Sequence, residues 1–90
     1  MPSPNGGKPF DMPDSPAARH RAAAETHDRA ASRHEAAALH WRRRGDFGRM
    51  NLELRNARLE RNAAQLQRER AVLREHEDDE AAAAGGPTRA

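Results

Sequence analysis

Three histidines recur at intervals of seven residues in the first half of the chain: His20, His27 and His34. Two histidines on one helix bind the same metal ion when they are four residues apart, whereas a seven-residue interval separates them by about 10.5 Å along the axis. We therefore predict no metal site within one chain. Because imidazoles change charge near neutral pH, histidines stacked along a helix–helix contact are instead a hypothetical pH-sensitive column whose protonation would loosen an assembly.

A run of basic residues lies next to an aromatic residue at the centre of the chain. Trp41 is followed by Arg42, Arg43 and Arg44, and Phe47 comes three residues later. Basic side chains interleaved with aromatic ones are typical of nucleic-acid-binding surfaces. Arginine also interacts favourably with the C-terminal end of a helix, so the same run has a purely structural interpretation. Contact of these three arginines with nucleic acid is therefore our alternative hypothesis.

No residue pattern in the chain is typical of catalysis. The chain has no cysteine, which excludes a thiol nucleophile, a cysteine-ligated zinc site and a disulfide. It also lacks a glycine-rich phosphate loop and a G-x-S-x-G turn. Its carboxylates are expected on solvated helix faces, and a pair of helices offers no concave substrate pocket. We therefore predict a protein that is not an enzyme and that has no cofactor, metal or small-molecule substrate.

The composition favours helices over sheets. Nineteen of the 90 residues are alanine, and the β-branched residues are one valine and two threonines. Alanine has the highest helix propensity, whereas sheets favour β-branched residues. No stretch is apolar enough for a transmembrane span or a secretory signal, so we expect a cytoplasmic protein that does not contact a membrane. Residues 1–15 hold four of the six prolines and are predicted to be a disordered arm.

Capping signals divide the rest of the chain into two helices. Ser15 can cap a helix that has Pro16 in its first position. Gly45 suits the left-handed residue that ends a helix, and Asp46 can cap the next one. A two-residue connection makes two long helices run antiparallel.

The predicted fold is therefore all-α, a long antiparallel αα-hairpin that is coiled-coil-like, with disordered N- and C-terminal tails. The first helix spans residues 16–44, the turn 45–46 and the second helix 47–78. Residues 79–90, acidic at first and then rich in alanine and glycine, are predicted to be a flexible tail.

The second predicted helix carries the bulkier apolar surface. Four of its leucines recur every seven residues, and we predict that they form the main interaction seam with the alanine face of the first helix. This seam consists of Leu52, Leu59, Ala63, Leu66, Leu73, Ala23, Ala30, Ala37 and Trp41. A second, weaker stripe lies well round the same helix: Met50, Leu54, Ala57, Ala64 and Ala71. The second helix therefore has two faces that can pack.

Such a thin apolar surface favours association with other helices. Burial of four leucines contributes about 6–12 kcal/mol, which must offset the conformational entropy lost when about 60 residues become ordered. A lone hairpin is marginal on this basis. We predict a helical interaction module that forms a homo-oligomer, either a dimer or a four-helix bundle, or that docks onto a helical partner protein. Parallel and antiparallel pairings of two copies both stay open.

The turn region resembles the junction of a tetratricopeptide-type helical hairpin, in which a Gly-Asp-aromatic step links two helices. Gly45, Asp46, Phe47 and Ala57 match that pattern, while Met50 stands where alanine is usual and no second repeat follows. The His/Ala repeats that end in this turn also resemble small bacterial Ala/His-rich helical-hairpin proteins, over about residues 17–60. Both resemblances imply a hairpin and neither implies an activity.

Overall fold

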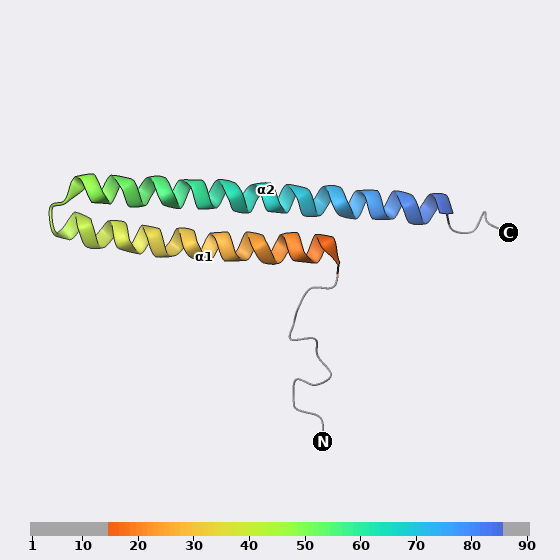
Figure 1. Ribbon diagram of the computed structural model, residues 1–90, viewed down its shortest axis with the longest axis horizontal. Coiled ribbons are helices and arrows are strands. Elements are labelled where there is room, and N and C mark those ends of the chain that lie inside the picture. The colour runs from red at the N-terminus through yellow and green to blue at the C-terminus, as the bar shows by residue number, and fades with distance from the viewer. Residues whose placement is uncertain (1–14, 86–90) are drawn as a thin grey trace, which may run out of the picture.

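The protein is a hairpin of two long helices. The computed structural model describes residues 15–85, in which α1 spans Pro16–Arg43 and α2 spans Phe47–Gly85. The helices run side by side in opposite directions and are joined by a short turn (Figure 1). The predicted antiparallel hairpin is thereby confirmed. The tails predicted to be disordered fall largely on residues 1–14 and 86–90, which lie outside the described part of the chain.

The start of α1 follows its capping signal. Ser15 has an extended backbone (φ −94°, ψ 153°), and its Oγ accepts a hydrogen bond from the N–H of Ala18 at 3.0 Å. This bond satisfies one of the N–H groups that a helix leaves unpaired at its first turn. Pro16 occupies the first turn, where the N–H that it lacks is not needed. The predicted beginning of this helix is confirmed.

The turn reverses the chain direction by means of one left-handed residue and one cap. Gly45 has φ 75°, a conformation that costs glycine little and most other residues more. The N–H of Asp46 donates to the carbonyl of Trp41 at 2.9 Å. Oδ1 of Asp46 then accepts the N–H of Arg49 at 3.0 Å and so caps α2. The roles predicted for Gly45 and Asp46 are confirmed, and α1 ends one residue earlier than predicted because Arg44 is its C-cap.

The second helix is longer than the sequence predicted. It continues to Gly85 rather than ending at residue 78, and its last turns extend beyond the beginning of α1 (Figure 1). The alanines at 81–84 have high helix propensity, and they move the preceding acidic residues away from the unfavourable C-terminal end of the helix dipole. Two contacts between residues four apart support the same segment: the Arg74–Asp78 ion pair and the approach of His76 Nε2 to Glu80 Oε2 at 3.5 Å.

The contact between α1 and α2 is built from alanine. Within residues 15–84, every buried side chain is an alanine, and we call this set the alanine seam: Ala17, Ala24, Ala31, Ala38, Ala57, Ala64 and Ala71. The members recur every seven residues on each helix, so they line one face of each. A methyl group is the smallest side chain that excludes water, so the seam lets the helices approach closely. Each buried methyl contributes only about 0.8 kcal/mol, which makes the core thin.

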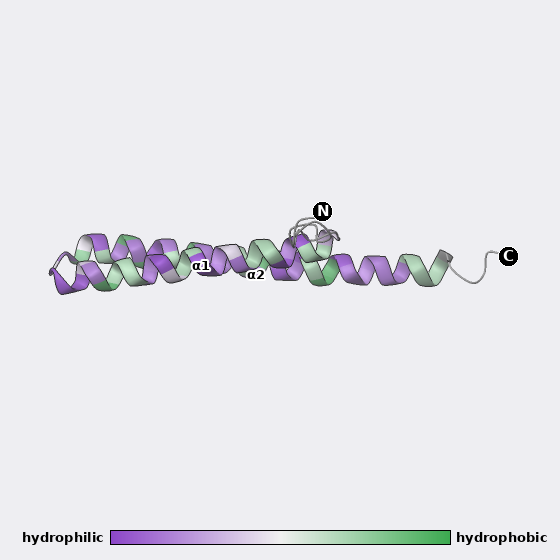
Figure 2. Ribbon diagram, turned by 90° about the horizontal axis from the view of Figure 1, so that it is seen from below, coloured by the Kyte–Doolittle hydropathy of each residue, from purple (hydrophilic) through white to green (hydrophobic). Residues whose placement is uncertain are grey.

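The leucines predicted to face α1 lie elsewhere. Each of Leu59, Leu66 and Leu73 follows a buried alanine by two residues, which is about 200° round the helix. Leu52 bears the same relation to the half-buried Met50. Consequently the predicted packing of the leucines against the first helix is wrong within the hairpin, and the weaker stripe faces α1 instead. Coloured by hydropathy, both helices alternate between hydrophobic and hydrophilic residues along their length (Figure 2).

The remaining members of the predicted seam are intermediate in exposure. Ala23, Ala30 and Ala37 on α1 and Ala63 on α2 are half-buried, as is Trp41. Each of these four alanines immediately precedes a buried alanine, so it lies about 100° from the centre of the contact. They flank the alanine seam rather than form it.

The alanine seam predicts a strict limit on side-chain size. Replacing Ala31, which is fully buried, with leucine inserts three carbon atoms between the helices and should destabilise the hairpin by about 1–3 kcal/mol. Ala36→Leu is the matched control, because Ala36 is exposed on the same helix. Thermal unfolding followed by circular dichroism at one protein concentration measures both. Equal melting temperatures for the two variants would contradict a close-packed alanine contact.

Candidate functional site

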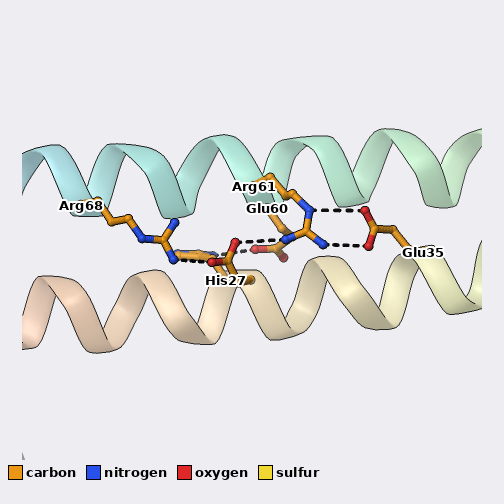
Figure 3. Close-up of polar contacts among 6 residues, drawn as sticks. His27, Glu35, Glu60, Arg61 and Arg68 are labelled. Atoms are coloured by element: carbon orange, nitrogen blue, oxygen red, sulfur yellow. Dashed lines mark hydrogen bonds and ion pairs between the residues drawn. The ribbon is translucent and has the colours of Figure 1, made fainter.

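The predicted histidine column lies along one edge of the alanine seam, where each ring contacts α2. Nδ1 of His27 is 2.6 Å from Oε1 of Glu60, as shown in Figure 3. The other two contacts, His20 Nδ1–Gln67 Oε1 at 2.7 Å and His34 Nδ1–Glu53 Oε1 at 2.6 Å, repeat this geometry. Each step moves seven residues forward on α1 and seven back on α2, so the three contacts form a regular histidine ladder. Because a carboxylate only accepts, Nδ1–H donates in the two glutamate contacts.

The histidine ladder bears on the interpretation of the column as a pH-sensitive element. His27 and His34 face carboxylates on the opposite helix, and their side chains are 36% and 33% exposed. A neutral imidazole donates to the carboxylate, and a protonated imidazole would add an ion pair to the same contact. The three contacts join α1 to α2. The hypothesis that protonation loosens an assembly stays a prediction.

Oppositely charged residues run along the other edge of the seam. We call this set the charged ladder, and its rungs are Arg21–Glu75, Asp28–Arg68 and Glu35–Arg61. Nη2 of Arg61 donates to Oε1 of Glu35 at 2.7 Å, and Nη1 of the same guanidinium donates to Asp28 at 3.3 Å (Figure 3). Successive rungs again move by seven residues in opposite directions on the two helices. One arginine therefore links two rungs of the charged ladder.

Guanidinium groups lower the pKa of two carboxylates of the charged ladder, Asp28 and Glu75. The hydrogen bond from Arg68 is the main cause that lowers the pKa of Asp28, and the charges of Arg68 and Arg61 add to it. The hydrogen bond from Arg21 lowers the pKa of Glu75 in the same way. Partial desolvation opposes both effects without cancelling them. Both contacts are therefore ion pairs at neutral pH.

The basic run lies around the turn end of the hairpin. Arg42, Arg43 and Arg44 are exposed, whereas Trp41 is half-buried. The guanidinium carbon of Arg49 lies 5.0 Å from the centre of the Trp41 ring, and the same arginine forms an ion pair with Asp46 at 2.6 Å. This cation–π contact occupies one surface of the ring. The aromatic partner expected to accompany the basic run is thus already engaged within the chain.

The outer side of α2 carries a regular row of large apolar side chains that the fold leaves uncovered. We call Leu52, Leu59, Leu66 and Leu73 the leucine stripe, and their exposed fractions range from 46% to 65%. Val72 lies beside it and is 61% exposed. A separate shallow groove of about 290 Å³ is present near the turn, with Leu39, Met50 and Leu54 among its lining residues. The sequence did not predict this groove, although Met50 and Leu54 belong to the weaker stripe.

Residues 15–85 were not expected to bind a metal ion or to cross a membrane. No three histidine or acidic side chains of this segment converge as ligands of one metal ion. Neither α1 nor α2 contains a stretch that is long and apolar enough to cross a membrane. The exposed surfaces of this segment include the leucine stripe, a groove of about 420 Å³ beside Leu73 and Val72, the groove near the turn and the basic run.

The charged ladder predicts a loss of stability in acid. Because folding lowers the pKa of Asp28 and Glu75, their contribution is complete above the ordinary values of 3.8 and 4.5 and disappears as the pH falls through the lower values of the folded state. The urea midpoint should therefore drop between about pH 5 and pH 2. Asp28→Asn should lower the midpoint at pH 7 and flatten this dependence. Identical profiles for Asp28→Asn and the unmodified chain would contradict the ion-pair assignment.

Comparisons with known proteins complete the description of the hairpin. Searches of protein-family models, of curated proteins and of solved structures gave no match to this chain. The resemblance to tetratricopeptide-type and Ala/His-rich hairpins therefore stays a prediction.

Proposed function

We propose that this protein is a non-enzymatic self-association module, in which a second copy of the chain covers the leucine stripe. One observation carries the proposal. The fully buried side chains between α1 and α2 are all alanines, while four regularly spaced leucines on the outer side of α2 stay between 46% and 65% exposed. Four large apolar side chains of the hairpin are thus placed where they do not contribute to its own core.

The energetics of burial support an intermolecular role for the leucine stripe. Burying a leucine side chain fully contributes about 1.5–3 kcal/mol relative to leaving it exposed. The stripe extends over 21 residues, or roughly 32 Å of helix. Exposed leucines that repeat every seven residues along one helix face are typical of a helix–helix contact. Covering them with another helix would add hydrophobic burial that the hairpin alone does not provide.

The residues that flank the leucine stripe are also typical of a helix–helix contact. Three residues after each of the first three leucines come Arg55, Asn62 and Glu69, all exposed. Charged and polar side chains in such flanking positions select partner and orientation in coiled coils. A helical partner protein would use the same surface, and it is the other occupant that we consider.

A polar replacement within the stripe tests the proposal. Leu59→Gln combined with Leu66→Gln should reduce the assembly to the mass of one 10.0 kDa chain, while helicity persists because neither leucine is buried in the hairpin. Leu39→Gln is the control, because Leu39 is an equally large exposed leucine (49%) that lies on α1, away from the stripe. Light scattering after size exclusion measures the mass, and circular dichroism measures the helicity. An unmodified chain that stays monomeric at millimolar concentration would overturn self-association.

Nucleic-acid binding through the basic run is the second candidate function, and it is favoured by the exposure of Arg42, Arg43 and Arg44 at one end of the hairpin. Three phosphate contacts would give log K a slope of about −2.7 against log salt on duplex DNA. Replacing all three arginines with alanine should then remove this slope, whereas Arg58→Ala on the middle of α2 should retain it. Binding that is independent of salt would contradict this function.

A further inference from the structure

We infer that two copies pair antiparallel through α2, with Leu59 of one copy packed between Leu66 and Leu73 of the second copy. This inference rests on the proposed self-association and adds its orientation and register. The occupant of the leucine stripe is then the leucine stripe of another chain, related by a two-fold axis that crosses α2 near residue 64. The charges and polar groups on both sides of the stripe carry the inference.

A parallel pairing is disfavoured by the residues that precede the leucines. In a parallel, in-register pair each seam residue faces its own copy, and the positions three residues before Leu52 and Leu73 are Arg49 and Arg70. Two pairs of like charges would therefore meet beside the leucines. In an antiparallel pair, residues from opposite ends of the stripe meet instead, so neither arginine faces itself.

In a parallel pair, the acidic residue that would pair with Arg55 is already bound within the hairpin. Such a pair would match Arg55 with Glu60 of the second copy, five residues further along the helix. Oε1 of Glu60 already accepts from His27 at 2.6 Å in the histidine ladder. The antiparallel pair leaves the histidine ladder intact, because the residues that it uses lie away from α1.

The hairpin itself shows how flanking residues match in an antiparallel contact. In both ladders, a residue three or four positions after a seam residue meets the equivalent position on the other helix, with the order reversed. Applied to the leucine stripe, the same rule places Arg55 opposite Glu69 of the second copy and Asn62 opposite its own copy. The two-fold axis generates the Arg55–Glu69 pair twice. On the other flank, Asn56 meets Glu77 and Arg70 meets Ala63.

Neighbouring registers lose this complementarity. A shift of one heptad in one direction places Arg55 opposite Asn62, and Leu73 then lies outside the paired region. A shift in the other direction places Arg55 opposite His76 and brings Arg70 against its own copy. Only the register centred near residue 64 combines four leucines from each copy with two ion pairs of opposite charge. Arg55, Asn62 and Glu69 are all exposed, so they can pair without disturbing the hairpin.

Charge reversal tests the register. Arg55→Glu or Glu69→Arg alone turns two attractions into two repulsions and should raise the dimer dissociation constant about tenfold. The double variant restores opposite charges at both sites and should return the constant to within about threefold of the unmodified chain. Arg58→Glu is the control, because it changes the net charge as Arg55→Glu does but lies off the stripe. A double variant as weak as the single ones overturns the register.

Distances between spin labels test the orientation. The chain has no cysteine, so Asn51→Cys and Arg58→Cys each give one labelled site per copy. In the antiparallel dimer, the label pair at position 51 should be about 21 Å further apart along the axis than the pair at position 58. A parallel dimer gives equal distances, which overturns the orientation while self-association stands. A monomer without any intermolecular distance overturns the proposed function itself.

Discussion

The thickness of the alanine side chain is the constraint on which the rest of the structure depends. Because only methyl groups separate α1 from α2, the helix axes lie close enough for the short imidazole of His27 to reach the carboxylate of Glu60 at 2.6 Å. Arginine has a long, adaptable stem and tolerates a wider separation. A seam of leucines would thus break the histidine ladder before it broke the charged one. The two edges of the hairpin therefore depend to different degrees on the same core.

The alanine seam brings the helices together but does not select their register. Its residues repeat identically every seven positions, so a slip by one heptad would still bury alanine against alanine. The charged ladder distinguishes these arrangements. A slip in one direction would place Arg21 opposite Arg68, and a slip in the other would place Asp28 opposite Glu75. Like charges at these separations repel each other. The alanines therefore hold the helices together, and the order of the charges selects their register.

The sequence predicted the caps and the turn, which depend on neighbouring residues, but it placed the end of α2 at residue 78 rather than at Gly85. The choice of packing face required information from both helices together. Ser15, Gly45 and Asp46 act locally, and each has its predicted role. The leucine stripe was expected to face inward because leucine is more hydrophobic than alanine. Ranking side chains by hydrophobicity considers each helix alone. The face that actually packs is the one whose flanking residues form the histidine ladder and the charged ladder with the other helix. Glu53 and Glu60 share the seven-residue interval of His27 and His34, and this match was the signal available in the sequence.

The rungs of the ladders also imply an order in which the hairpin closes. His34–Glu53 joins residues 19 apart in the chain, His27–Glu60 33 apart, His20–Gln67 47 apart and Arg21–Glu75 54 apart. Closing the shortest loop first costs the least entropy, and each later rung then closes only the short additional length beyond the previous one. Folding therefore proceeds like a zipper from the turn outward. Opening proceeds in reverse from the free ends of the helices. The contacts between α1 and α2 therefore last longest next to the turn at Gly45 and break most often at the opposite end of the hairpin.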